Sequence, residues 1–356
     1  MYTRFNDNDI VSLTSQELVT STWTNNINNL QVAHTQSSQA DFTTATSSGH
    51  FFIDVFNNHT ASISGGIAQY SVTFGHSAGS GSPDFTNDTG SFGLSATKAI
   101  YSQYRQLHFN DDTQNFTFGT HTTSPRVNTP IYAININRAR YKQKLTPGSL
   151  NLHISGCTLG VGFANQNVVH LTDDSAVNEA IGTSVSLGPY FSIVSGTNGT
   201  PLTGTTSLTQ VGGSSSYGHF YPEAGLIILN ADAFSGSISG ASNPGGPTAN
   251  TDKNQERLFN HISAAGHFIV DSTEEINSEF YFVRARNHQF NYTNNESFVD
   301  VNKNVFHESM KLNPKVFITT VGLYNDAFEL LAVAKLSQPV AKDFTKEALI
   351  RVKLDY

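Results

Sequence analysis

Residues 315–356 read KVFITTVGLYNDAFELLAVAKLSQPVAKDFTKEALIRVKLDY, and this C-terminal stretch decides the fold class. It contains three apolar runs, which are Val316–Tyr324, Glu329–Leu336 and Ala348–Tyr356. The pair Asn325-Asp326 joins the first two runs. Both residue types favour tight turns, because their side chains bond locally and tolerate left-handed backbone. The first two runs are therefore predicted to form a hairpin.

The third run has the pattern of a half-buried strand. A mainly apolar face alternates with a mainly charged one, in the order Leu349, Ile350, Arg351, Val352, Lys353 and Leu354. A period of two is the side-chain period of a strand. Between the hairpin and this run stands Pro339, which interrupts any strand ladder because proline has no backbone donor. We therefore predict a three-stranded meander over residues 315–356, with an ordered C-terminus.

The composition of the chain suits strands better than helices. Its 356 residues are enough for a sizeable core. Charged residues are only 13%, whereas aromatic residues reach 11%, with 25 Phe and 13 Tyr. Aromatic residues are enriched in strands, and Gly, Ser and Asn in turns. The sequence predicts a mainly β fold of antiparallel sheets, sandwich-like or meander, with two or so short helices and long Gly/Ser/Thr-rich loops.

The N-terminal part differs from the rest in its polarity. Residues 1–48 hold only isolated hydrophobic side chains, too few to form a core. We interpret them as an extended polar arm that is ordered by lying on another surface, with Asp9–Thr20 as a candidate short helix; a floppy terminus is the alternative. Residues 49–356 are interpreted as a β-rich core domain with a loop-rich insertion at about 195–250 and the C-terminal meander at 315–356.

Two helices and a series of strands are expected in the core domain. The helices are Ser95–Phe109, with an apolar face at helical spacing, and Lys253–Ala265, which Gly266 ends. The turn Thr146-Pro147-Gly148 predicts that Leu150–Ser155 is the hairpin partner of Ile131–Arg140. Further strands are expected at Phe51–Phe56, Ala68–Phe74, Gln166–Asp173, Tyr190–Val194, Gly225–Asn230 and Glu279–Arg286.

Charge and cysteine content narrow the function classes. The net charge of −8 weighs against a nucleic-acid binder, which usually carries a basic stripe. The N-terminus has no secretory pattern, and no run approaches the roughly 20 apolar residues that span a bilayer. The single Cys157 excludes an intramolecular disulfide and a cysteine zinc site. We therefore expect a protein made in a cytoplasm, without membrane insertion.

Motifs for common catalytic chemistry are incomplete in this sequence. A phosphate-binding Gly-rich loop is missing, and Gly236–Gly240 has isoleucine at the nucleophile position of a serine-hydrolase elbow. His307-Glu308 lacks the second histidine of a zinc motif, because Lys311 stands there. The 13 histidines are scattered singly, and His261 and His267 do not share a helix face.

Two acidic pairs remain as candidates. Asp111-Asp112 resembles the start of a calcium loop but lacks its central glycine and closing glutamate. Asp173-Asp174 ends a predicted strand, where adjacent side chains point to opposite faces and cannot easily form the carboxylate pair of a glycosidase. A solvated strand end is favoured for this pair. The sequence thus predicts no catalytic, cofactor-binding or metal-ligating residues, no cofactor and no enzymatic activity.

Several runs, in this order, resemble a family of virion structural proteins of contractile-tailed marine bacteriophages of the cyanophage type. The runs, which cover about half of the chain from about residue 50 onward, are SATKAIYSQYR at 95–105, IYAININRAR at 131–140, LTPGSLNLHI at 145–154, YGHFYP at 217–222, GLIILN at 225–230, EFYFVR at 279–284, ITTVGLYN at 318–325, LLAVAK at 330–335 and RVKLDY at 351–356. The hairpin runs are also similar to segments of other phage tail and baseplate proteins.

The resemblance implies a structural subunit of a bacteriophage virion, made in the host cytoplasm, with no catalytic residues. We expect it in the tail baseplate, where its arm and its loops at Ser195–Ser216 and Ser235–Asn250 would contact other virion proteins and copies of itself in a symmetric assembly. A neck- or capsid-associated structural protein is an alternative within the virion.

Two further alternatives belong to other function classes. One is a receptor- or glycan-binding adhesin of the phage tail that uses the aromatic island Tyr217–Tyr221 and takes host surface glycan as partner. The other is a polysaccharide hydrolase that uses Asp173 or Glu223, although no motif supports it.

Overall fold

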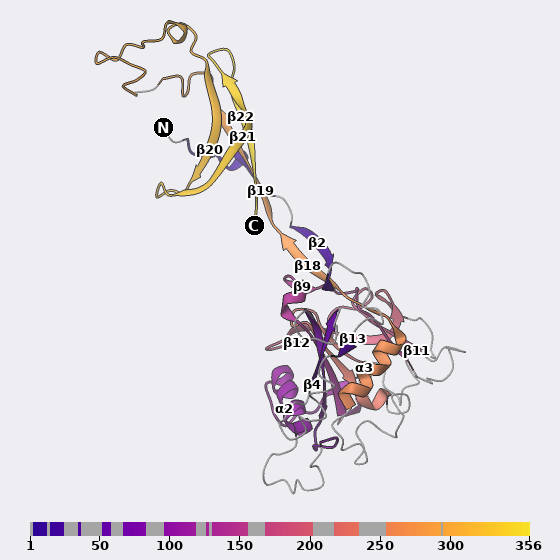
Figure 1. Cartoon of the computed structure of the whole chain (residues 1–356). Coiled ribbons are helices and arrows are strands. Elements are labelled where there is room, and N and C mark those ends of the chain that lie inside the picture. The colour runs from indigo at the N-terminus through magenta and orange to yellow at the C-terminus, as the bar shows by residue number, and fades with distance from the viewer. Residues whose placement is uncertain are drawn as a thin grey trace. The chain divides into compact units, whose positions relative to one another are not determined.

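The computed structural model describes residues 3–12, 15–24, 35–36, 52–57, 67–82, 96–118, 126–127, 130–155, 168–201, 217–234, 254–292 and 295–356. The chain divides into two compact units (Figure 1). The central unit is Leu18–Glu274, and the terminal unit combines Met1–Glu17 with Glu275–Tyr356.

Within the described residues, the central unit is built on an antiparallel 12-stranded sheet that includes a curled half-barrel of nine strands (Figure 1). The strand order along the sheet is β17 (Phe268–Ile269), β10 (Asn151–Ser155), β11 (Val168–Asp173), β13 (Gly188–Thr197), β15 (Gly218–Tyr221), β16 (Leu226–Asn230), β8 (Pro130–Ile136), β5 (Ile67–His76), β4 (Phe52–Asn57) and β3 (Thr35–Gln36). Two short strands, β12 (Gly182–Ser184) and β14 (Thr200–Pro201), also pair with β13. The mainly β, antiparallel prediction is confirmed.

Short elements complete the central unit. Its smaller sheets are β2 (Gln16–Ser21) with β18 (Asp271–Ile276) and β9 (Lys144–Leu145), and β6 (Thr117–Phe118) with β7 (Arg126–Val127). The described part of the chain has two α-helices, α2 (Ala96–Phe109) and α3 (Asn254–Ala265), at nearly the predicted bounds. The 3-10 turns in the described residues are η1 (Asp7–Asp9), η5 (Arg138–Arg140), η6 (Ala231–Phe234) and η8 (Glu308–Met310).

The two helices cover opposite faces of the sheet. Leu258 of α3 joins the larger core, which also contains Tyr132 and Ile134 of β8. Tyr101 of α2 joins a second core with Ala133, the residue between them on β8. Because both faces are covered along most of β8, nearly all of its side chains are buried, as is typical of a strand between two layers.

The terminal unit packs a hairpin against a three-stranded sheet. The hairpin joins β20 (Val316–Tyr324) to β21 (Leu330–Lys342), and the sheet has the order β1 (Ile10–Ser12), β19 (Ser278–Ala285), β22 (Ala348–Asp355). The side chains at the centre of the cluster between them are Val321, Leu323, Ile350 and Val352. The predicted hairpin and the predicted apolar face of the last strand are confirmed.

The predicted three-stranded meander is wrong in its last step. Strand β22 pairs with β19 along its whole length, from Ala348 opposite Ala285 to Asp355 opposite Ser278. It contacts the hairpin through side chains instead of backbone hydrogen bonds, since its alternating apolar face lies on the hairpin. Pro339 does fall outside the ladder, because the register shifts between Ile318 and Thr320 on β20.

Two other local predictions are wrong because long-range pairing overrides local pattern. The candidate helix Asp9–Thr20 is replaced largely by strands β1 and β2, which bond to β19 and β18. The turn at Thr146 forms, with Ser149 N donating to Thr146 O at 3.2 Å and Gly148 at a φ of 86°. It leads from β9 to β10, however, and β10 pairs with β11 and β17 instead of β8.

Much of the predicted insertion lies outside the described residues, since only residues 195–201 and 217–234 of about 195–250 are described. Most of the arm and Cys157 also lie outside them.

Candidate functional site

Three polar side chains form a row across one face of the central sheet. Asp54 on β4 stands opposite Ser71 on β5, and Ser71 stands opposite Asn135 on β8. Residues directly opposite in neighbouring antiparallel strands project from the same face, with Cβ atoms about 5 Å apart. The row therefore brings together a carboxylate, a hydroxyl and an amide from distant parts of the sequence.

The row begins at the edge of the part of the sheet that helix α2 covers. Further along the same face, Gly75 stands opposite Ile131, and a Cβ at Gly75 would lie 2.9 Å from the backbone nitrogen of Tyr101. Helix α2 therefore rests directly on β5 there. Between the two regions, Thr73 on β5 makes a side-chain hydrogen bond to Tyr104 of α2. The face thus changes from covered and apolar to open and polar along the length of β5.

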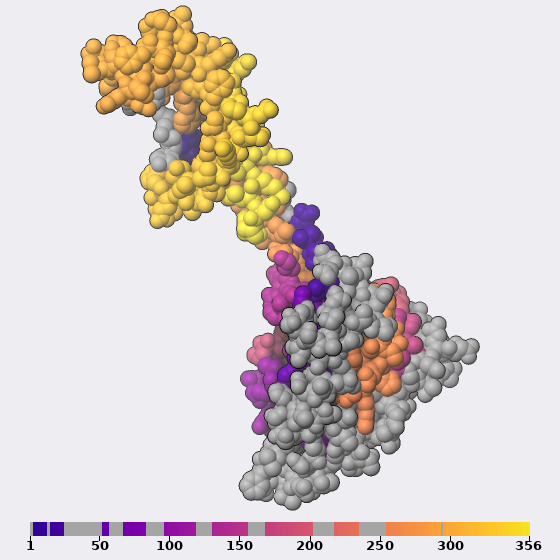
Figure 2. All heavy atoms as spheres, viewed as in Figure 1, coloured from indigo at the N-terminus to yellow at the C-terminus, as the bar shows by residue number. Residues whose placement is uncertain are grey.

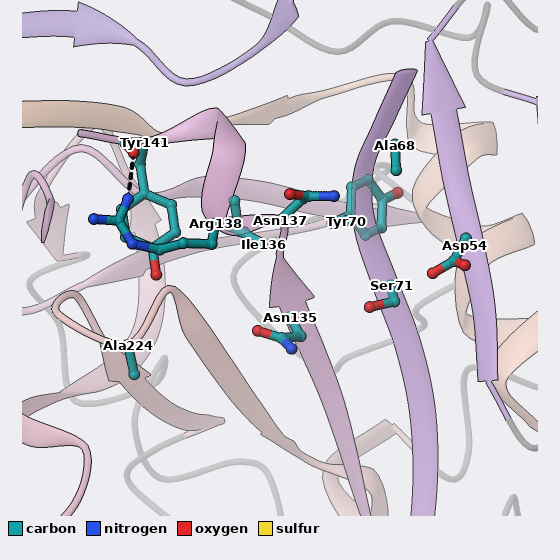
Figure 3. A pocket seen from close by; sticks show the side chains of 10 residues that line it. All are labelled: Asp54, Ala68, Tyr70, Ser71, Asn135, Ile136, Asn137, Arg138, Tyr141 and Ala224. Atoms are coloured by element: carbon teal, nitrogen blue, oxygen red, sulfur yellow. Dashed lines mark hydrogen bonds between the residues drawn. The ribbon is translucent and has the colours of Figure 1, made fainter. Parts of the chain in front are cut away.

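A pocket of about 440 Å³ opens over this polar row (Figure 3). Its lining comes from β4, β5, the end of β8 and the segments that follow β8 and β15: Asp54, Ala68, Tyr70, Ser71, Asn135, Ile136, Asn137, Arg138, Tyr141 and Ala224. The volume lies in the range of small-molecule sites in proteins, about 300–1,000 Å³.

One wall of the pocket is fixed by contacts around Tyr141. Arg138 Nη1 donates a 2.6 Å hydrogen bond to the carbonyl oxygen of Tyr141 (Figure 3). The guanidinium carbon lies 4.6 Å from the centre of the Tyr141 ring, within cation–π distance. Behind the ring, a Cβ at Gly225 would lie only 2.6 Å from Tyr141 Cε1, and Gly225 has a φ of 65°. Glycine is therefore required there to seat the ring.

The floor of the pocket has unused hydrogen-bonding capacity. Asp54 is half-buried, and burial raises the pKa of its carboxyl above the ordinary value. No described residue donates a hydrogen bond to Asp54 or forms an ion pair with it. Ser71 and Asn135 likewise have no side-chain hydrogen bond within the described ranges. The amide oxygen of Asn137, by contrast, already accepts from Ala139 N at 3.0 Å.

The acidic pair Asp173-Asp174 is buried, so the solvated strand end favoured from the sequence is wrong. Asp173 is 0% exposed, and its carboxylate accepts from Gly148 N at 2.6 Å and Leu150 N at 3.2 Å. Asp174 accepts from Ser192 N at 2.9 Å. Burial raises the pKa of both carboxyl groups. The pair holds the loop after β9 and the strand β13 in place.

The aromatic island of the adhesin alternative is also buried. Tyr217, Phe220 and Tyr221 are at most 4% exposed, because β15 lies between β13 and β16 in the sheet. These rings pack inside the central unit and cannot stack on a glycan. Glu223, the other hydrolase candidate, is exposed.

The remaining motif candidates do not form a metal site. The Asp111 carboxylate accepts from Thr113 N and Thr113 Oγ1, both at 2.8 Å, so it closes a local turn. The residue pair His307-Glu308 begins the short η8 turn. Within the described ranges, no three His, Cys, Asp or Glu side chains are grouped so that they could hold a metal ion. Gly236–Gly240 lies outside those ranges.

Sequence reasoning missed a stack of three histidines. The rings of His153 and His170 are parallel at 3.8 Å, and His267 lies 4.1 Å from His153 on the other side. Burial, followed by the charges of its two neighbours, lowers the pKa of His153 to about 3. The sequence predicts both strands, but it predicts β8 as the partner of β10 instead of β11. The correct hairpin places His153 opposite His170.

A pair of histidines lies where the end of helix α2, which contains His108, meets strand β15, which contains His219. Burial lowers the pKa of His108 to about 4 and that of His219 to about 3. The Tyr221 hydroxyl lies 3.0 Å from His108 Nδ1 and 3.5 Å from His219 Nδ1. These histidines are core residues, and their burial favours the neutral form.

In the terminal unit, the hairpin presents apolar side chains to solvent. Leu331 is 68% exposed, Phe317 63% and Val333 58%. They alternate with the side chains that pack on β19 and β22, so they project from the outer face of β20 and β21. We call this the outer hairpin face; the yellow atoms of these C-terminal strands lie at the surface in Figure 2.

A scan against protein-family models and searches of curated proteins and of solved structures found no match to this chain. None of the described helices is both long enough and apolar enough to cross a membrane.

Proposed function

We propose that this chain is a structural subunit of a bacteriophage virion, most specifically of the tail baseplate. It would assemble through its arm and loops with other virion proteins and with copies of itself. The ordered series of sequence runs that resembles virion structural proteins motivates the proposal. A position in the neck or capsid is the alternative within the virion.

The outer hairpin face is the observation that carries this proposal. Leu331, Phe317 and Val333 leave large apolar surfaces in water on one side of a two-stranded hairpin. Exposed apolar patches on stable proteins commonly mark protein–protein contacts, because their burial is favourable by about 25 cal/mol per Å². Such a face suits a subunit that is completed by its neighbours.

The free edges of the hairpin add a second means of contact. Among the described strands, β20 pairs only with β21 and β21 only with β20. The outward edge of each strand therefore has backbone groups available for a strand of a neighbouring chain. Strand addition at such an edge is a common mode of protein assembly. Apolar side chains beside the edge would strengthen the contact with an added strand.

Mass spectrometry of purified particles of the phage that encodes this chain tests the proposal. We expect the chain in stoichiometric, symmetry-related copies, and in the baseplate fraction after the particles are dissociated. Its absence from washed particles would refute the virion assignment. Its presence in the head or neck fraction alone would support the alternative location.

The adhesin alternative loses its sequence support, because Phe220 and Tyr221 are inside the central unit. The hydrolase alternative that uses Asp173 also loses support. Asp173 is fully buried and already accepts hydrogen bonds from two backbone amides, so it cannot act as a nucleophile or base on a polysaccharide.

A further inference from the structure

We propose that the pocket over β4, β5 and β8 binds a saccharide unit. Asp54, Ser71 and Asn135 would contact the sugar hydroxyls from the floor, and Arg138 from the wall (Figure 3). This inference does not depend on the virion proposal, since it rests on the central unit alone.

The side chains that line the pocket offer both hydrogen-bond donors and hydrogen-bond acceptors. A carboxylate only accepts hydrogen bonds and a guanidinium only donates them, while a serine hydroxyl and an asparagine amide do both. A sugar hydroxyl also both donates and accepts, so different hydroxyls of one ligand can satisfy Asp54 and Asn135 at the same time. The available side chains thus fit a ligand with several hydroxyl groups.

The spacing of the row fits a ring rather than an ion. Neighbouring strands lie about 4.8 Å apart, so Asp54 and Asn135 stand roughly 10 Å apart across β5. A single cation cannot bridge ligands at this separation, because metal–oxygen distances are about 2.0–2.6 Å. A pyranose or a disaccharide is large enough to contact all three side chains.

Asp54 supplies a driving force for ligand binding. Asp54 is half-buried and accepts no hydrogen bond from the described residues, although a partly desolvated carboxylate is costly without one. A ligand hydroxyl that donates to Asp54 would recover this cost. The negative Asp54 and the positive Arg138 balance each other, which favours a neutral ligand over a phosphate or a polyanion.

The wall of the pocket formed by Arg138 and Tyr141 is preorganised for binding. Arg138 is held by the Tyr141 carbonyl and the Tyr141 ring, and the ring is seated on Gly225. A side chain that is already fixed loses less conformational entropy on binding. The guanidinium nitrogens that do not bond to the Tyr141 carbonyl remain able to donate to a ligand.

Titration of the full chain with neutral saccharides tests the proposal. The probes are glucose, galactose, mannose, N-acetylglucosamine and their β-linked disaccharides, with calorimetry and two-dimensional NMR as readouts. We expect at least one probe to bind and to shift the backbone resonances of residues 54, 71 and 135. Asp54→Ala and Asn135→Ala should each weaken binding about tenfold or more, as expected when a hydrogen bond to the ligand is lost.

The controls separate binding from folding. Asp112→Asn removes an exposed carboxylate outside the pocket and should leave affinity unchanged. Asp54→Asn should not lower the melting temperature, because no described residue pairs with this partly desolvated carboxylate. The absence of binding by every probe, or equal binding by Asp54→Ala and wild type, would overturn the proposal. Tighter binding of a zwitterionic amino acid such as glycine would also overturn it, since the charged ends Asp54 and Arg138 would then select charge.

The outcome is independent of the location of the chain. A chain absent from virions that still binds the saccharide would refute the proposed function only. A virion subunit that binds no probe would refute the saccharide site only.

Discussion

The indole nitrogen of Trp23 donates a 2.8 Å hydrogen bond to the carbonyl oxygen of Phe268, and the two rings meet edge to face at 4.9 Å. Trp23 is 1% exposed, although it belongs to a segment that the sequence assigns to a polar arm. This contact ties the N-terminal part of the central unit to strand β17, near the C-terminal end of the same unit.

Removal of the Trp23 ring should destabilise the protein strongly. Burial of a large aromatic side chain and its hydrogen bond make Trp23→Ala cost about 3–5 kcal/mol of unfolding free energy. Leu18→Ala, at an exposed position of the same segment, should cost less than about 1 kcal/mol. Urea unfolding followed by circular dichroism measures both. Equal costs for the two variants would mean that Trp23 is not a core residue.

Gly225→Ala should destabilise the protein by more than its backbone strain alone, because it displaces the Tyr141 ring in the pocket wall. The new Cβ would meet the Tyr141 ring at 2.6 Å, and the backbone φ of 65° is unfavourable for alanine. Gly148→Ala is a matched control, because Gly148 has a φ of 86° but its nearest contact would be 3.5 Å away. We expect Gly148→Ala to cost about 1 kcal/mol and Gly225→Ala clearly more, by thermal unfolding. A smaller cost for Gly225→Ala would contradict the seating of Tyr141 on this glycine.

Asp173→Asn should lower stability. The new NH2 group would face the amide of either Gly148 or Leu150 with a donor, where Asp173 now offers an acceptor to each. Loss of charge-assisted bonds at a fully buried site should cost about 2 kcal/mol or more. Asp112→Asn, at an exposed site, provides the baseline in the same melting experiment. A stable Asp173→Asn protein that loses a polysaccharide-hydrolysing activity would instead revive the enzyme alternative.

The buried histidines should make the fold weaker in mild acid. Burial lowers the pKa of His219 to about 3, while an unfolded histidine titrates near 6.5. Below about pH 6.5 the unfolded chain therefore takes up protons that folded His219 cannot, and stability is lost as the pH falls toward 3. One such histidine contributes up to about 2 kcal/mol between pH 6.5 and 5.0.

Comparison of urea midpoints at pH 7.5 and pH 5.0 isolates this effect. His219→Gln and His153→Gln should each show a smaller loss between the two pH values than wild type. His288→Gln, at an exposed position, should show the same loss as wild type. A wild-type midpoint that does not fall at pH 5.0 would show that these histidines become protonated without unfolding.

Elements whose structure depends on the pattern of neighbouring residues could be predicted from the sequence. The alternation from Leu349 to Leu354 predicts which side of β22 is buried, and the 3.6-residue period predicts helix α2. The pair Asn325-Asp326 predicts the turn of the last hairpin. In each case the residues that decide the structure are neighbours in the chain.

Long-range pairing could not be read in the same way. Strand β22 takes β19 as its partner, and nothing in residues 315–356 indicates this. Asp173 is buried because the amides of Gly148 and Leu150, more than 20 residues earlier, point to it.

The polar row could not be predicted from the sequence for the same reason. Asp54, Ser71 and Asn135 meet only through the registers of β4, β5 and β8. A single sequence contains each strand but does not state which residues stand opposite one another.

The central claim, that the chain is a virion subunit completed by its neighbours, is tested most directly by incorporation into particles. A phage that lacks the gene would be complemented with wild-type chain, with Leu331→Asp or with Asn302→Asp, an exposed polar position outside the hairpin. We predict that wild type and Asn302→Asp enter the particles and that Leu331→Asp, which places a charge on the outer hairpin face, is reduced at least tenfold while it remains folded. Equal incorporation of Leu331→Asp, or absence of the wild-type chain from infectious particles, would contradict the account.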